Sequence, residues 1–473
     1  MLKEYIALFP EFLLFLGIIF MSFVRLFRRI NTPKTFYTIS NFFIICAAVF
    51  SAIFYNQNVG EYLHNNNFTS LFKSLTYLFV LIWNYLSVKR FLSKNTPSFA
   101  FYTIVMFNLL CLLLAISTLN LWILFFSLAA SFLCNYPLVL IEEKPAEKII
   151  SLRFFLFSLL FVGAFAAGLL IFNRYTDNFA YSNLLNMLEQ QEIPLSTGFI
   201  AISLIFAFML FVIGIAPFHF WFSEAVEVSI LPVAGYLTIV PIFTYFACLI
   251  NISANVFAPY MTYFYKIFYI FGILSVFAGA IGANSEDNMR KIFAYSGLYY
   301  IGFIILGLFP LSEQSLVSSF IYLLIYITAF CGIYTVFCGY RSKGRYLSCL
   351  DDIKGVSSQR PYISAALLLF MISLIGTPPM LGFLGKLSII NTMVIEHKYT
   401  IIGIVLLGLL ILVYAYLKII TAVYFESRNN NFDIVDKGVY LCVLFNLLFM
   451  LIVIINPKPL MQEVENTLIM VMK

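Results

Sequence analysis

Charge is what this sequence most conspicuously lacks. Asp, Glu, Lys and Arg make up 11% of its residues, whereas about 25% is usual in a soluble globular domain. Hydrophobic residues make up 62%, and the mean hydropathy is +0.96. So few charges cannot solvate the surface of a chain of 473 residues. The composition therefore excludes a soluble protein and indicates an all-α protein that crosses a membrane many times.

Histidines and paired cysteines are scarce as well. The chain has three histidines, and its eight cysteines include no C-x-x-C pair. A bis-histidine haem and an iron–sulfur cluster both need such ligands, and no Gly-rich nucleotide-binding turn occurs either. The net charge of +6 comes without a basic stripe on a soluble surface. We expect no catalytic residue, redox centre, metal or cofactor on this chain, and no nucleic-acid partner.

Long apolar runs are what the sequence has in abundance. Since a membrane span needs about 20 such residues, the runs predict about fourteen transmembrane helices. They lie near residues 5–24, 36–55, 70–88, 99–117, 119–140, 153–172, 195–220, 231–250, 261–283, 292–309, 315–339, 361–394, 400–424 and 438–456. Two alternatives stay open: runs 99–117 and 119–140 form one merged pair, or twelve spans accompany two half-helices.

Basic residues are distributed unevenly between the predicted loops. The loops after odd-numbered helices hold most of the 28 Lys and Arg residues, among them Arg25, Arg28, Arg29, Lys94, Lys144 and Arg428. The opposite face holds few, and Lys73 is counted there. Because basic loops stay on the inner side of a membrane, we expect both termini on the outer face.

Proline interrupts two of the apolar runs. One contains Gly214-Ile-Ala-Pro217-Phe-His219, and the other contains Gly376-Thr-Pro378-Pro379. Proline breaks a helix because it lacks a backbone donor, and broken backbone at membrane depth survives where protein or water satisfies the freed groups. We therefore expect two helix breaks that line a polar pathway.

Ionisable side chains near these breaks are the candidates for that pathway. Lys386 is the single formal charge in the 35 residues between Arg360 and Glu396, so it is either an interior functional lysine or one that snorkels to the surface. His219 is suited to exchanging protons near neutral pH, or it caps the carbonyls freed at Pro217.

Other charged residues are weaker candidates for the polar pathway. Lys418 either joins the pathway or pairs toward the inner face. Arg153 stands at the start of a predicted helix, where an interfacial anchor is the stronger interpretation from the residue alone. Glu224 and Glu227 follow the first break in a predicted loop, where carboxylates are usually solvated.

Four motifs then resemble one family. They are Gly214-Ile-Ala-Pro-Phe-His-Phe-Trp221 followed by Glu224 and Glu227, Asn288-Met-Arg-Lys-Ile-Phe-Ala-Tyr-Ser296, Leu350-Asp-Asp-Ile-Lys-Gly355, and Gly376-Thr-Pro-Pro-Met-Leu-Gly-Phe-Leu-Gly-Lys386. In this order and spacing, over about residues 118–425, they resemble the antiporter-like proton-channel subunits of respiratory complex I. The branch they resemble most is that of NADH dehydrogenase subunit 2, the N-type subunit in bacteria.

The resemblance implies a fold and a setting. It implies two inverted five-helix repeats with broken helices 7 and 12. The predicted parts are residues 1–98, the repeats 99–250 and 251–425, and a C-terminal part 426–473. It implies a subunit of a proton-translocating NADH:ubiquinone reductase whose FMN, iron–sulfur clusters and ubiquinone lie on other subunits. Implied partners are the neighbouring antiporter-like subunit 4, the small 4L/K-type subunit and lipids such as cardiolipin. The implied location is the mitochondrial inner membrane with termini toward the intermembrane space, or a bacterial plasma membrane.

The sequence departs from the family at positions where the family's proton path has charged side chains. Ala129, Val212 and Ile242 stand near the positions of a glutamate and two lysines. Arg153 replaces a lysine that could titrate, since arginine stays protonated, and Tyr300 replaces a histidine. Lys386 is retained, and Lys418 matches a late basic position of the family.

Three functions remain open from the sequence. In the first, protons move along Lys386, His219, Tyr295 and other hydroxyls together with water. In the second, the subunit is a non-conducting structural part of the same complex. A multisubunit cation/proton antiporter is the third, and the loop motifs argue against it.

Overall fold

The computed structural model describes residues 8–27, 32–54, 58–59, 62–93, 98–141, 145–309, 311–427 and 432–469. These residues form two compact units. Unit 1 takes residues 1–213, 228–263 and 469–473, and unit 2 takes residues 214–227 and 264–468. The segment around the first proline break thus belongs to unit 2, although its neighbours in sequence belong to unit 1. The four-part division and the correspondence of the two repeats stay predictions.

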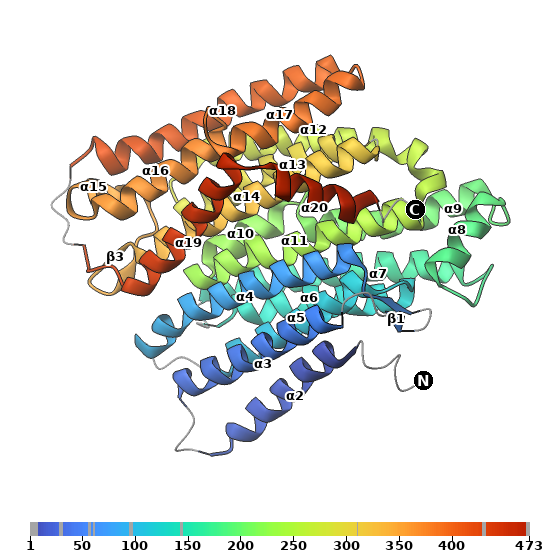
Figure 1. Ribbon diagram of the computed structural model, residues 1–473, viewed down its shortest axis with the longest axis horizontal. Coiled ribbons are helices and arrows are strands. Elements are labelled where there is room, and N and C mark those ends of the chain that lie inside the picture. The colour runs from blue at the N-terminus through green and yellow to red at the C-terminus, as the bar shows by residue number, and fades with distance from the viewer. Residues whose placement is uncertain are drawn as a thin grey trace. The chain divides into compact units, whose positions relative to one another are not determined.

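Unit 1 is a bundle of helices with one very short sheet (Figure 1). Its helices are α2 (Phe9–Val24), α3 (Pro33–Ile53), α4 (Asn67–Ser93), α5 (Ser98–Ser117), α6 (Leu121–Val139), α7 (Pro145–Phe172), α8 (Tyr181–Glu189), α9 (Leu195–Ile213), α11 (Leu231–Asn255) and the 3-10 helix η2 (Ala258–Tyr260). Strands β1 (Asn58–Val59) and β2 (Leu63–His64) pair antiparallel. Helix α4 packs against α3, α5 and α11, and this packing positions the polar residues discussed below.

Unit 2 is also helical, with a second short hairpin. Its elements are α10 (Phe220–Val228), α12 (Met261–Ser285), α13 (Met289–Leu308), α14 (Glu313–Gly339), β3 (Arg341–Ser342), β4 (Arg345–Tyr346), η3 (Leu350–Ile353), α15 (Val356–Gln359), α16 (Pro361–Ile375), α17 (Leu381–Ile395), α18 (Tyr399–Tyr424), α19 (Lys437–Ile455) and α20 (Lys458–Ile469). Helix α14 packs against α13, α16, α17 and α19. It is therefore the central helix of this unit.

Short polar residues begin several of these apolar helices. Asn120 accepts a hydrogen bond from the backbone N–H of Trp122 at the start of α6, and Asn288 caps α13 in the same way through Arg290. The Ser312 side chain accepts from Ser315 at the start of α14. Such caps satisfy backbone donors that have no partner inside the helix. They fix where each apolar run turns into helix.

The predicted fold class, an all-α membrane protein with broken helices 7 and 12, is confirmed. Each predicted run contains a helix, and twelve helices in the described part of the chain are long and apolar enough to span a membrane. Helices α2, α16 and α17 are apolar but shorter. The total of fourteen spans and the orientation of the loops stay predictions. Both extreme ends, with Arg28, Arg29, Lys94, Lys144 and Arg428, lie outside the described residues.

Some predicted boundaries were wrong. Helix α7 begins at Pro145 rather than near 153, so Arg153 lies two turns inside it. The run predicted over 195–220 ends as helix at Ile213, and a separate helix, α10, follows the break. Helices α8 and α20 were not predicted, because each is short and amphipathic rather than uniformly apolar.

The two breaks have the same local structure. Gly214 follows α9 with φ of +80°, and Gly376 follows α16 with φ of +83°. Glycine adopts this left-handed conformation readily and commonly ends helices. A cis peptide bond precedes a proline three residues after each glycine, at Ala216–Pro217 and at Pro378–Pro379. The two runs therefore resemble each other in backbone conformation as well as in sequence.

Candidate functional site

Lys386 lies inside unit 2, against the second break. Its residue is 6% exposed, and its Nζ donates hydrogen bonds of 2.7 Å to the carbonyl oxygens of both Leu374 and Ile375. These carbonyls end α16, where no further helical N–H reaches them. They carry the negative end of the helix dipole, and within the described residues Lys386 has no carboxylate partner. The end of a broken helix, rather than an acidic residue, thus holds this ammonium group.

A chain of hydroxyl groups leads away from Lys386. The Tyr300 hydroxyl donates to the same Leu374 oxygen at 2.8 Å, and the Tyr416 hydroxyl donates to that of Tyr300 at 3.2 Å. Ser296 lies 2.7 Å from the Tyr416 hydroxyl. Since Tyr416 uses its proton toward Tyr300, Ser296 is the donor in the last pair. All three hydrogen bonds therefore point the same way, from Ser296 toward the carbonyl shared with Lys386.

Two more buried tyrosines border this chain. The rings of Tyr322 and Tyr326 lie 6.3 Å and 5.4 Å from that of Tyr300. Both residues are almost completely buried, and neither hydroxyl finds a partner among the described residues. Buried polar groups of this kind are usually satisfied by ordered water. The surroundings of Tyr300 are therefore suited to hold water beside the hydroxyl chain.

The first break brings His219 into the same unit. The imidazole meets the Tyr295 ring edge-on at 6.1 Å, and Tyr295 precedes Ser296 of the hydroxyl chain. Nδ1 of His219 is buried without a hydrogen-bond partner among the described residues. The Ala216 N–H, freed by the break, donates to the Ser275 hydroxyl at 2.9 Å. Four of the six predicted pathway residues, namely His219, Tyr295, Tyr300 and Lys386, thus lie in unit 2 around α13.

Lys418 lies in another part of the same unit. Its Nζ donates to the carbonyl oxygen of Asn284 at 2.7 Å and helps to line a polar cavity of about 240 Å³. Lys354 on the cavity wall pairs with Asp351 at 2.8 Å and with Glu426 at 2.7 Å. Lys418 therefore borders a polar space large enough for several waters, and among the described residues it makes no hydrogen bond to Lys386 or to the hydroxyl chain.

The prediction that Glu224 and Glu227 lie in a solvated loop was wrong. Both residues belong to α10 and are half-buried. A carboxylate oxygen of Glu227 lies 3.5 Å from Nζ of Lys291, which also binds Glu286 at 2.8 Å. The loop was predicted because Pro217 breaks the run, but the chain resumes a helix at Phe220.

Arg153 is the weakest of the predicted pathway residues. It lies in the interior of α7 along the sequence, on a side of the helix exposed in this chain. The prediction that it starts a helix was wrong, because α7 extends back to Pro145. Among the described residues of unit 1, no hydrogen bond or ion pair joins Arg153 to the interior groups described below.

Comparison with known proteins places the chain in a family. Residues 118–411 match the transmembrane family described as NADH:quinone oxidoreductase/Mrp antiporter. The chain belongs to this family. Subunit N of the NADH-quinone oxidoreductase of Rhodospirillum rubrum is 27% identical over 382 residues, which are 79% of this chain and 77% of that protein.

Solved structures share the antiporter-like fold. A chain of respiratory complex I from Thermus thermophilus matches with a TM-score of 0.80 and 21% identity, over 96% of this chain and 98% of that one. A chain of the Mrp complex from Dietzia matches with a TM-score of 0.84 and 15% identity, over 100% and 98%. At such identities the likeness establishes the fold of this family member.

The charges that the family resemblance implies for the first half are replaced by neutral groups. Ala129, Val212 and Ile242 are buried and apolar. Nearby on α5, α6 and α11, however, lies a polar cluster that the sequence analysis missed. Asn108 donates to the Ser131 carbonyl at 2.9 Å and to the Asn135 side chain at 3.0 Å, and the Ser131 hydroxyl lies 3.1 Å from that of Tyr245. The spacing of Ser127, Ser131 and Asn135 at every fourth residue was the available signal.

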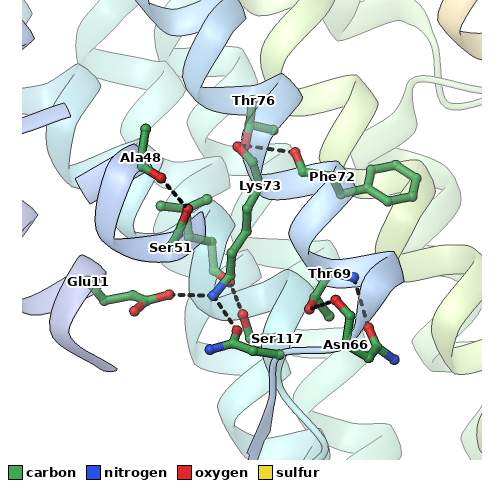
Figure 2. Close-up of polar contacts among 11 residues, drawn as sticks. Glu11, Ala48, Ser51, Asn66, Thr69, Phe72, Lys73, Thr76 and Ser117 are labelled. Carbon is green, nitrogen blue, oxygen red and sulfur yellow. Dashed lines mark hydrogen bonds and ion pairs between the residues drawn. The ribbon is translucent and has the colours of Figure 1, made fainter. Parts of the chain in front are cut away.

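A charged pair in unit 1 was also missed. Lys73, counted with the loops of the outer face, is instead the seventh residue of α4 and is 2% exposed. Its Nζ lies 2.7 Å from Oε1 of Glu11 on α2 and 2.8 Å from Oδ1 of Asn65 (Figure 2). Neither residue stands next to a motif of this family, and the two are 62 positions apart.

Proposed function

We propose that this chain is the N-type membrane-arm subunit of a proton-translocating NADH:quinone oxidoreductase, and that it carries protons through unit 2. Membership of the family supports the first part, as does the name of the Rhodospirillum relative. The hydroxyl chain that ends at the Leu374 carbonyl oxygen, to which Lys386 also donates, supports the second part and carries the proposal.

The chain has the order that a proton relay needs. A proton offered to Ser296 lets each hydroxyl pass its own proton onward, from Ser296 to Tyr416 and from Tyr416 to Tyr300. Tyr300 and Lys386 donate to one carbonyl oxygen, at 2.8 and 2.7 Å. A neutral Lys386 amine therefore lies within one small rotation, or one bridging water, of the Tyr300 proton. Lys386 is the acceptor at the end of this relay.

The carbonyl ends of α16 allow Lys386 to change charge. As an ammonium group it is held by the Leu374 and Ile375 oxygens and by the helix dipole. A carboxylate at this distance would hold it far more strongly. Because the two carbonyls are neutral, release of a proton leaves no uncompensated buried anion. The half-helix thus suits a lysine that alternates between two protonation states.

The setting of the subunit follows from the same proposal. Its partners are other membrane-arm subunits, specifically the antiporter-like subunit 4 and the small 4L/K-type subunit, with lipids such as cardiolipin at the exposed apolar faces. The membrane is a bacterial plasma membrane, or the mitochondrial inner membrane if the chain is the subunit 2 counterpart. The distribution of basic loop residues supports an outer location for both termini.

Removal of the Tyr300 hydroxyl tests the relay. Tyr300→Phe keeps the buried ring but interrupts the chain, so the assembled complex should move fewer protons per electron pair. Tyr299→Phe is the matched control: it removes a neighbouring buried hydroxyl that binds the Val405 carbonyl at 3.1 Å and stands outside the chain. Proton uptake by sealed vesicles is measured against NADH oxidation. Equal ratios in the two variants would refute conduction through this chain and favour a structural subunit.

A further inference from the structure

The Glu11–Lys73 pair is an unusual feature of a region outside the family match, which begins at residue 118. The side chains of Lys73 and Glu11 are 3% and 6% exposed. The second carboxylate oxygen of Glu11 is buried and has no hydrogen-bond partner among the described residues. The pair is therefore enclosed but incompletely satisfied.

Stability alone does not account for such a pair. Removing two charges from water costs several kcal/mol for each, and a buried pair is often replaced by apolar residues at no loss. The three helices α2, α3 and α4 have ample apolar residues for packing. Ionisable groups inside membrane helices are usually functional, and we interpret Glu11 and Lys73 in this way.

A polar cavity of about 170 Å³ lies at the start of α4, and its lining reaches to one turn before Lys73. Residues His64, Asn66, Thr69, Ser117, Asn251 and Asn255 line it, with three apolar neighbours. Asn65, which binds Lys73, lies between two of these lining residues in sequence, and Thr69 is one turn before Lys73 on α4. Figure 2 shows Asn66 and Thr69 hydrogen-bonded to each other in the same region as Lys73. The volume is enough for several waters, each needing about 30 Å³.

Beyond the pair, polar side chains continue along one side of α4. Tyr77 lies one turn after Lys73, and its buried hydroxyl lies near the Ser51 side chain, without a hydrogen bond of standard geometry among the described residues. Asn84 donates to Ser40 and Asn41 at 3.0 Å, while its own Oδ1 is buried and unpaired. The Ser87 hydroxyl follows, 3.2 Å from that of Tyr102. From Lys73 to Ser87 this stripe extends about 21 Å along the helix axis.

Three buried polar atoms thus lack a hydrogen bond of standard geometry among the described residues: Oε2 of Glu11, the Tyr77 hydroxyl and Oδ1 of Asn84. Buried groups are nearly always satisfied, so each marks a position for ordered water. Between Tyr77 and Asn84 the gap is about 10 Å along α4, and the buried Val80 lies within it, so a file of waters there requires a displacement of apolar side chains.

We propose that Glu11 and Lys73 form a proton-exchange site that takes protons from water in the His64 cavity and passes them to a water file along α4. This goes beyond the route through unit 2, because it lies on other residues. A proton from the cavity neutralises the Glu11 carboxylate. Lys73, now without its counter-ion, releases a proton to water beside Tyr77 and then takes the proton held by Glu11. The pair returns to its starting charges, and one proton has moved.

The test replaces both charges by amides of similar size. Glu11→Gln/Lys73→Gln keeps a hydrogen bond between the side chains but removes both ionisable groups. The assembled complex should then move fewer protons per electron pair than the wild type. Lys266→Gln, which neutralises an exposed lysine of α12, is the control and should leave the ratio unchanged. Asn84→Leu, which closes the stripe with an apolar side chain, should lower the ratio as well.

A second variant separates function from folding. Glu11→Leu/Lys73→Met packs the site with apolar groups and suits a purely structural role. A complex that contains it and pumps like the wild type would overturn the proposal. So would a high-resolution map without water between Tyr77 and Asn84. A wild-type ratio in the Glu11/Lys73 double variants with a lowered ratio in Tyr300→Phe would refute only the α4 site. A lowered ratio in the double variants with a wild-type ratio in Tyr300→Phe would refute only the route through unit 2.

Discussion

Breaking the Glu11–Lys73 pair on one side should be far more damaging than removing both charges. Lys73→Met deletes a 2.7 Å ion pair and a 2.8 Å hydrogen bond to Asn65. It leaves the Glu11 carboxylate 5% exposed, with one oxygen that already lacks a partner. An uncompensated buried charge of this kind costs about 3–5 kcal/mol.

That cost has a measurable size. Since about 1.4 kcal/mol is a factor of ten in an equilibrium constant, the folded-to-unfolded ratio should fall by roughly 100- to 4000-fold. For a unit of this size the melting midpoint should fall by about 6–20 °C. The assay is heat-induced loss of the chain from the purified complex, together with its amount in membranes. The double variant Glu11→Leu/Lys73→Met should keep a free energy of unfolding within about 1 kcal/mol of the wild type, or exceed it.

The comparison between the two variants decides the matter. If Lys73→Met and the double variant melt together, the carboxylate is not left as a buried charge in the single variant, and the electrostatic reasoning fails. An unchanged melting midpoint in Lys73→Met would mean that the pair is not enclosed as described. Lys266→Met, at an exposed position, should change the free energy of unfolding by less than about 0.5 kcal/mol.

Two further predictions concern a loop and a glycine. Burial lowers the pKa of His64, so protonation favours the unfolded state. The contribution of His64 to stability should therefore be complete above the pKa of the unfolded state, about 6.5, and should be lost as the pH drops through the lower pKa of the folded state. Melting curves measured at several pH values should show this loss in the wild type and not in His64→Gln. At Gly376, with φ of +83°, an added Cβ would lie 2.9 Å from Cδ of Lys386. Gly376→Ala should cost about 1–2 kcal/mol for the backbone alone and displace Lys386, whereas Gly403→Ala, with no atom within 4 Å, should be neutral or stabilising in the same thermal assay.

Local chemistry explains why much of the fold could be predicted. An uncharged run of about 20 residues has few alternatives to a spanning helix, and a glycine followed by prolines ends a helix wherever it occurs. The breaks at Gly214 and Gly376 were therefore predicted from local sequence. Helices α8 and α20 were missed because short amphipathic helices depend on the surface they cover.

Contacts between distant residues could not be predicted in the same way. Tyr300 and Tyr416 are 116 positions apart, and in an apolar helix one tyrosine looks like any other. Glu11 and Lys73 each stood near a helix end, where a solvated charge is the ordinary interpretation. Only the folded structure, in which α2 and α4 both pack against α3 and α5, brings the two side chains together.

The most direct test of the central claim is the proton-to-electron ratio of a complex that carries Lys386→Met. Methionine keeps the length and the apolar stem of lysine but cannot accept or release a proton. If the relay from Ser296 to Lys386 conducts, this complex should move fewer protons per electron pair, as Tyr300→Phe should, while Lys266→Met keeps the wild-type ratio. An assembled Lys386→Met complex with the full wild-type ratio would contradict proton transfer through Lys386.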